Sequence, residues 1–390
     1  MTSPPIPHSA FRNPHSNAPQ SPIRVLLVDD SPIALVIIKR ILAASPDIQV
    51  VGTAANGREA LEMIPRLQPG VICTDLHMPL LDGLEFTKAV MAQYPRPILA
   101  LSVSLQKEQT HNIFKLLEAG AIDVMAKPRG GLEASAGLDA QELISKIKIL
   151  SGVIVIRRRR NGSSAECGLQ NAELKPEPLA GELPIPQSAI RNPQLRTRIL
   201  GIGASTGGPQ ALQAILSQLP ASLPVPVLCV QHISEGFMQG LVDWLAEQCP
   251  MRIRTAETGV VPEPGTVYFP RDNTHLKIGG DGKLICSAEP ACNGHRPSIS
   301  VAFASLAQHY GSASACVLLT GMGRDGVDGM HAVRRAGGVT IAQDEDSSIV
   351  FGMPRQAIEE GAARHVLPLD KIASALVRLT NADFGMQIAE

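Results

Sequence analysis

The stretch Leu200-Gly-Ile-Gly-Ala-Ser-Thr-Gly-Gly-Pro-Gln-Ala-Leu212 passes from an apolar strand, through a glycine-rich turn, into a helix. The strand is expected over Arg198 to Ile202, and a strand followed directly by a helix is typical of α/β proteins. Ser205 lies at the bend, where its hydroxyl stands beside the free backbone N–H groups of the first helical turn. We therefore interpret Ser205 as a candidate nucleophile whose neighbours can stabilise a developing oxyanion.

Two other interpretations of this turn stay open from these residues alone: a nucleotide-binding loop and a plain strand-to-helix corner. Counted from Gly201, the third glycine of a Gly-x-Gly-x-x-Gly fingerprint would fall at Thr206. No lysine follows at the spacing of a phosphate-binding P-loop. Both observations disfavour a nucleotide site.

The composition limits the classes of function that the 390 residues can have. A net charge of −1 and 3% aromatic residues provide neither a broad basic surface nor stacking platforms, so no nucleic-acid partner is expected. The seven cysteines are never closer than six positions apart, which excludes Cys-x-x-Cys redox and zinc motifs. Without a secretory signal or an apolar run near about 18 residues, we expect a cytoplasmic protein with no direct membrane insertion.

Apolar runs alternate with amphipathic segments in two blocks, which predicts two doubly wound parallel-sheet α/β domains. Residues 23–150 form the first block and residues 196–385 the second. Residues 1–22 are rich in Pro, Ser, Asn and His and are expected to be a disordered extension, and residues 151–195 a flexible linker. The predicted strands are Val25–Val28, Val50–Ala54, Val71–Thr74, Pro97–Leu101, Ile122–Ala126, Ile199–Ile202, Val225–Val230, Thr266–Phe269, Ala315–Leu319 and Val339–Ile341.

Polar residues follow the strands of the first block. Asp29 and Asp30 end the first strand and Asp75 ends the third, so their carboxylates should meet at one edge of a parallel sheet. Such an oxygen-only set suits Mg²⁺. Ser102 and Lys127, at the ends of the fourth and fifth strands, add a hydroxyl and an ammonium group to the same edge.

This block resembles the response-regulator receiver domain, a flavodoxin-like fold. The resemblance rests on Val28-Asp-Asp-Ser31, Asp75-Leu-His-Met-Pro-Leu-Leu-Asp-Gly83, Ser102 and Lys127-Pro128. It implies that Asp75 accepts a phosphoryl group from a sensor histidine kinase while Asp29 and Asp30 help to hold Mg²⁺. It also implies that Ser102 and Lys127 bind the phosphoryl oxygens.

A histidine and an aspartate follow two strands of the second block, as Ser205 does. His232 ends Val225-Pro-Val-Leu-Cys-Val-Gln-His232, and Asp325 follows Ala315–Leu319 by a few residues. Since the carboxyl ends of parallel strands lie along one edge, a Ser–His–Asp triad is geometrically feasible. The chain order Ser205, His232, Asp325 differs from that of the α/β-hydrolases, which indicates a separate hydrolase lineage.

The second block resembles the catalytic domain of the CheB family of chemotaxis protein-glutamate methylesterases, expected to be Rossmann-like. The resemblance rests on Gly201–Pro209, Gln231-His232, Gly294-His-Arg-Pro-Ser298, Leu319–Gly326 and Gly352-Met-Pro-Arg355. It implies that Ser205 is the nucleophile, His232 the general base and then acid, and Asp325 the residue that orients the imidazole. Met322, through its backbone N–H, and Thr206 would help to bind the oxyanion or line the site.

Receiver, linker and esterase in this order imply a phosphorylation-activated serine esterase. Its substrates would be glutamate methyl esters and selected glutamines of methyl-accepting chemotaxis receptors, in sensory adaptation. Mg²⁺ is expected at the receiver and no cofactor in the esterase site. The alternative is a response regulator whose second block only binds a nucleotide or a partner protein.

Overall fold

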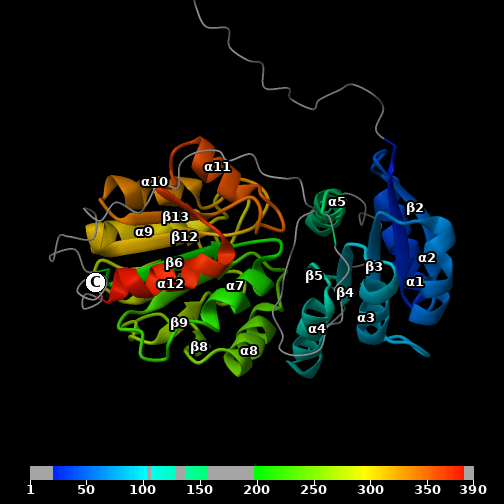
Figure 1. The fold of residues 1–390 in the computed structure, drawn as a ribbon, viewed down its shortest axis with the longest axis horizontal. Coiled ribbons are helices and arrows are strands. Elements are labelled where there is room, and N and C mark those ends of the chain that lie inside the picture. Colours follow the sequence, from blue (N-terminus) through cyan, green and yellow to red (C-terminus); the bar gives the residue numbers. More distant parts are fainter. Residues whose placement is uncertain (1–20, 103–106, 129–136, 154, 156–196, 382–390) are drawn as a thin grey trace, which may run out of the picture.

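The computed structural model describes residues 21–102, 107–128, 137–153, 155 and 197–381. The expected extension (1–22) and linker (151–195) lie almost entirely outside the described residues. Two large sheets, each with helices on both faces (Figure 1), and one small two-stranded sheet make up the described part. We call them the N-terminal domain (residues 21–155) and the C-terminal domain (residues 197–381).

The N-terminal sheet has the strand order β2-β1-β3-β4-β5, with every neighbouring pair parallel. Helices α1 and α5 pack on one face, and α2, α3 and α4 pack on the other. This is the predicted doubly wound arrangement. The elements are β1 (Ile23–Val28), α1 (Pro32–Ala43), β2 (Ile48–Ala54), α2 (Gly57–Leu67), β3 (Val71–Asp75), α3 (Gly83–Gln93), β4 (Ile98–Ser102), α4 (Lys107–Ala119), β5 (Asp123–Ala126) and α5 (Leu138–Leu150).

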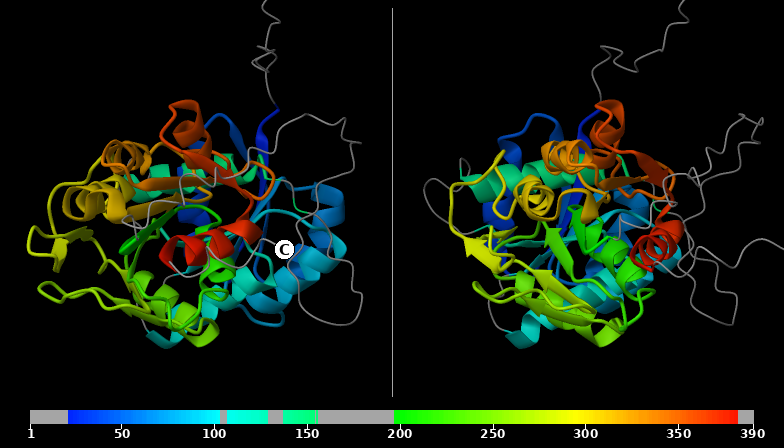
Figure 2. Two further views of the ribbon diagram at one scale, coloured as in Figure 1. Left: turned by 60° about the vertical axis from the view of Figure 1, so that its left-hand side comes forward. Right: turned by 90° about the vertical axis from the view of Figure 1, so that its left-hand side faces the viewer.

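The C-terminal sheet has the order β14-β13-β12-β6-β7-β9-β8 and is parallel throughout. Helices α7, α8 and α12 cover one face and α9, α10 and α11 the other (Figures 1 and 2). The elements are β6 (Ile199–Ala204), α7 (Gly208–Leu216), β7 (Val227–Gln231), α8 (Met238–Gln248), β8 (Arg252–Thr255), β9 (Thr266–Phe269), β10 (His275–Ile278), β11 (Leu284–Ser287), α9 (Ile299–Tyr310), β12 (Ser314–Leu318), α10 (Val327–Arg335), β13 (Val339–Gln343), α11 (Met353–Glu359), β14 (His365–Leu367) and α12 (Leu369–Thr380).

The central strands of both sheets are buried on both faces, as expected for parallel strands between helical layers. Each of the ten predicted strands is present, with its ends displaced by no more than two residues. Strands β8, β10, β11 and β14 were not predicted. Strands β10 and β11 form an antiparallel pair outside the main sheet.

Candidate active site

Three neighbouring strands of the C-terminal sheet end beside one another. In the order β12-β6-β7, Leu318 pairs with Gly203, and Ala204 pairs with Gln231. Ser205 directly follows β6, His232 directly follows β7, and Asp325 lies in the loop after β12. The three residues predicted from sequence therefore lie at one edge of the sheet.

The turn that carries Ser205 depends on two glycines. Gly207 has φ 76°, a left-handed conformation that favours glycine. A side chain at Gly208 would overlap the amide oxygen of Gln231. The Ser205 N–H donates to the Thr320 carbonyl (3.0 Å), which attaches this turn, the serine turn, to the end of β12.

Gln231 connects the serine turn to the histidine. Its Nε2 donates to the carbonyls of Ser205 and His232, both at 2.8 Å. The side chain is buried, and it spans the ends of β6 and β7. Gln231 therefore fixes the separation between the backbones of the candidate nucleophile and the candidate base.

The imidazole of His232 is paired with Asp325. Its Nε2 lies 2.9 Å from Asp325 Oδ2. Because a carboxylate only accepts hydrogen bonds, Nε2 carries the proton in the neutral ring and Nδ1 is the basic atom. Nδ1 is buried and has no hydrogen-bond partner among the residues that the structure describes. A proton acceptor is thus oriented and left free.

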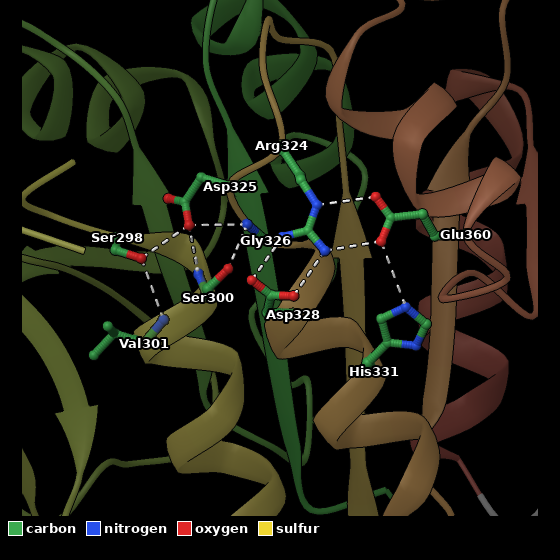
Figure 3. A network of polar contacts seen from close by, with 9 residues as sticks. All are labelled: Ser298, Ser300, Val301, Arg324, Asp325, Gly326, Asp328, His331 and Glu360. Carbon is green, nitrogen blue, oxygen red and sulfur yellow. Dashed lines mark hydrogen bonds and ion pairs between the residues drawn. The ribbon is translucent and has the colours of Figure 1, made fainter. Parts of the chain in front are cut away.

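The carboxylate of Asp325 is held by the start of α9 (Figure 3). It accepts hydrogen bonds from the Ser300 N–H (3.1 Å) and from the Ser298 hydroxyl (2.9 Å), both drawn in Figure 3. The Ile299 N–H also donates to it, at 2.7 Å. The Gly326 N–H donates to it as well, at 2.9 Å. Burial alone would raise the pKa of Asp325, but the hydrogen bond and charge of His232, together with these backbone donors, hold it below its usual value. Asp325 therefore stays ionised.

Arg324 ties the loop of Asp325 to two helices (Figure 3). Its guanidinium makes two hydrogen bonds to Asp328 of α10 (2.8 and 2.9 Å) and two to Glu360 at the end of α11 (2.9 and 2.8 Å). These paired contacts hold the backbone next to Asp325 in place.

Two backbone N–H groups near Ser205 remain available. Those of Thr206 and Met322 make no hydrogen bond with the described residues. The residue after a serine nucleophile commonly supplies one oxyanion donor. The Ser205 hydroxyl is likewise not hydrogen-bonded to His232 in this structure, and free enzymes often show this contact as long or misaligned.

The five polar residues predicted in the N-terminal domain also lie at one edge. Carboxylate oxygens of Asp29, Asp30 and Asp75 lie within 4.8 Å of one another. Lys127 Nζ is 2.6 Å from Asp29 Oδ2 and 2.9 Å from Asp75 Oδ2, and Ser102 is buried at the end of β4. Burial disfavours the charged form of Lys127, but the two aspartates raise its pKa above the usual value. Three converging carboxylates fit the oxygen ligands that Mg²⁺ prefers.

The two domains contact each other next to the active-site loops. Helix α4 lies beside α8 (Figure 1). Phe114 of α4 stacks on Trp244 of α8, with ring centroids 5.6 Å apart. Trp244 Nε1 donates to Glu118 at 2.7 Å. Ser234, two residues after His232, donates to Glu142 of α5 at 3.2 Å.

A second contact between the domains lies next to the turn that carries Ser205. Ile349 packs against the buried cluster of the N-terminal domain, and a side chain at Gly207 would meet Ile349 at 2.8 Å. Gln210 of α7 donates to the carbonyl of Ala121 at 2.9 Å. The N-terminal domain therefore contacts both the segment that follows Ser205 and the loop that follows His232.

Comparison with known proteins identifies the family. The profile described as CheB methylesterase matches residues 200–376, and that of the response regulator receiver domain matches residues 25–136. A protein-glutamate methylesterase/protein-glutamine glutaminase of Nitrosospira multiformis is 40% identical over 359 residues, which cover 92% of this chain and 97% of the relative. The chain belongs to the CheB methylesterase family.

Other relatives of the family match over the same length. A protein-glutamate methylesterase/protein-glutamine glutaminase of Geobacter metallireducens is 38% identical over 360 residues, covering 92% of this chain and 99% of the relative. Among solved structures, the Thermotoga maritima CheB methylesterase catalytic domain is 38% identical, with a TM-score of 0.46. The match covers 47% of this chain and 98% of the chain in that structure. The expected family, fold class and enzyme class are confirmed.

Several residues around the site were not predicted to have a role. Gln231, His295 and Ser298 all lie in motifs that carry the resemblance, but no chemistry was predicted for them. His295, from the loop before α9, stacks on His232. Among the described helices, none is both long and apolar enough to cross a lipid bilayer.

Proposed function

We propose that this chain is a cytoplasmic, phosphorylation-activated serine esterase that hydrolyses glutamate methyl esters on chemotaxis receptors and deamidates selected glutamines. The relatives named above carry both activities in their names. The observation that carries the proposal is the His232–Asp325 pair: Nδ1 of His232 has no hydrogen-bond partner among the described residues, and His232 follows the strand next to that of Ser205.

In the first step, Ser205 Oγ attacks the γ-carbonyl carbon and its proton moves to Nδ1 of His232. Asp325 stabilises the imidazolium that forms, and the N–H groups of Thr206 and Met322 bind the oxyanion. The proton then passes to the leaving oxygen as the carbon–methoxy bond breaks, which releases methanol and leaves an acyl-enzyme.

The second step reverses the roles with water. His232 takes a proton from a water molecule, whose oxygen attacks the acyl carbon. The bond to Ser205 breaks, the serine recovers its proton from His232, and a glutamate carboxylate is released. A glutamine follows the same path with ammonia in place of methanol.

Control resides in the N-terminal domain. A sensor histidine kinase would transfer a phosphoryl group to Asp75, and Ser102 and Lys127 would bind its oxygens. Mg²⁺, held by Asp29, Asp30 and Asp75, would supply positive charge that neutralises the transferring group. Because this domain packs on the loops of Ser205 and His232, the docked arrangement blocks receptor helices, and phosphorylation shifts the population toward release.

Labelling with a fluorophosphonate probe tests this function against a module that only binds. Such probes react with an activated serine, so we expect modification of Ser205 in the phosphorylated chain and none in Ser205→Ala. A chain that binds methylated receptors but leaves the probe unreacted would be a binding module.

A further inference from the structure

A second histidine covers the ring of His232. The rings of His295 and His232 are stacked, with centroids 4.1 Å apart and an angle of 4° between their planes. His295 comes from the loop between β11 and α9, whereas His232 follows β7. One face of the His232 ring is therefore covered by His295, which comes from a different part of the fold than the strand ends that carry Ser205, His232 and Asp325.

The loop that carries His295 is firmly held. Cys292 and His295 exchange two backbone hydrogen bonds of 3.0 Å around a turn at Asn293 (φ 52°) and Gly294 (φ 82°). The next residue, Arg296, donates to Asn273 Oδ1 at 2.8 Å and to the carbonyls of Ala288 and Glu289 at 3.1 and 3.2 Å. A ring carried on such a turn can serve as a fixed surface.

The environment keeps this surface uncharged. Burial and then the charge of His232 lower the pKa of His295 to about 4, against the opposing effect of Asp325. The nearby charged residues Glu235, Asp272 and Arg296 line a small hollow beside the loop. A neutral ring next to His232 does not repel the imidazolium that forms during catalysis, whereas a second imidazolium at this distance would.

We propose that His295 is a positioning residue: a neutral, flat ring that holds the imidazole of His232 in line with Asp325 and directs its Nδ1 toward the serine turn. Asp325 alone holds only one atom of the imidazole, which leaves the ring free to swing about that hydrogen bond. Stacking removes this freedom, and the face of the neutral ring also accommodates the transient positive charge. This inference rests on the proposed esterase function and refines its site.

The proposal is tested by measuring methanol release from methylated receptor membranes by the full chain activated with acetyl phosphate. We expect His295→Ala to lower kcat by about 10- to 100-fold with little change in KM, because the base is misplaced rather than the substrate lost. His295→Phe restores a flat neutral ring and should recover most of kcat. The control is His309→Ala, which removes a histidine that contacts Tyr310 and not His232. Its kcat should match that of the wild type.

Wild-type kcat in His295→Ala would overturn the proposal. So would a His295→Phe variant that is folded, as judged by its urea midpoint, yet as slow as His295→Ala. A wild type that releases no methanol would refute the esterase function itself, which is a different result.

A second measurement needs no substrate. The ring NMR signals of His232 report how firmly the ring is held. We expect one sharp set of signals in the wild type and in His295→Phe, and signals broadened by exchange between ring orientations in His295→Ala. Equally sharp signals at the same shifts in all three proteins would show that His295 does not restrain the ring.

Discussion

The carboxylate of Asp325 accepts five hydrogen bonds: one from His232, three from backbone N–H groups and one from Ser298. All five of these groups are donors. If asparagine replaced Asp325, its NH₂ group, which only donates, would face at least one of them. Asp325 thus orients the imidazole of His232 and also caps the start of α9.

Asp325→Asn should lower kcat for methanol release by about 10²–10⁴-fold, because the imidazolium loses its counter-charge and the tautomer is no longer fixed. Steady-state kinetics on methylated receptor membranes measures this. Ser298→Ala, which keeps the carboxylate, is the matched control and should lose about 1 kcal/mol of stability with a much smaller effect on kcat. Equal kcat losses in the two variants would refute the assigned role.

His295 should make the stability of the chain depend on pH. Its pKa in the folded protein is about 4, against an ordinary value of 6.5, so the unfolded chain binds a proton first as the pH falls. The stabilisation is therefore complete above pH 6.5 and is lost progressively toward pH 4. Urea midpoints measured across this range should fall more steeply for the wild type than for His295→Phe, and parallel curves would contradict the burial of a neutral ring.

At the level of secondary-structure elements, α5 is joined to β5 by a buried ion pair. Lys146 Nζ lies 2.6 Å from Asp123 Oδ2, and both side chains are almost fully buried. Burial disfavours the charged lysine, but Asp123 and then Glu142 raise its pKa above the usual value. Helix α5 also supplies Glu142, which contacts Ser234, so its position matters for docking.

Lys146→Met should destabilise the full chain by about 3–5 kcal/mol, because it leaves the carboxylate of Asp123 buried without a counter-ion. The double variant Asp123→Asn/Lys146→Met removes both charges and should recover much of that loss. Urea denaturation of the two variants gives the comparison. If the double variant were as unstable as the single one, packing rather than charge would account for the effect.

Elements with long apolar runs could be predicted from the sequence, and so could the positions of the candidate site residues that follow such runs. Ser205, His232 and Asp325 each follow a buried strand, and period and position suffice to find them. Strands β8 (Arg-Ile-Arg-Thr) and β14 (His-Val-Leu) are short, half-exposed edge strands without an apolar run, so no pattern marks them. His295 lies in an irregular loop, and its contact with His232 depends on tertiary packing.

At the level of the whole molecule, the contact between the domains is made by residues far apart in the chain. Glu118 and Trp244 are 126 positions apart, and no local pattern pairs them. Glu118 also accepts a hydrogen bond from Gln248 Nε2. One buried cluster runs from the N-terminal domain into the C-terminal domain through α4 and α8. This continuity favours the docked arrangement before phosphorylation.

Glu118→Ala should weaken docking, because the buried N–H of Trp244 loses its acceptor in the docked state. The cost of about 1–3 kcal/mol predicts a basal rate roughly 5- to 150-fold higher in the unphosphorylated full chain, up to the limit set by the released enzyme. The rate after acetyl phosphate treatment should not change, since the C-terminal domain is untouched. A fragment starting near residue 194 sets the fully released rate, and an unchanged basal rate in Glu118→Ala would refute inhibition by docking.

The rate of methanol release from methylated receptor membranes tests the central claim most directly, measured with the activated full chain and with its Ser205→Ala and His232→Ala variants. The account predicts that each substitution lowers the rate by at least about 10²-fold, because the hydroxyl and the imidazole act as one unit. A near-wild-type rate in either variant would contradict it.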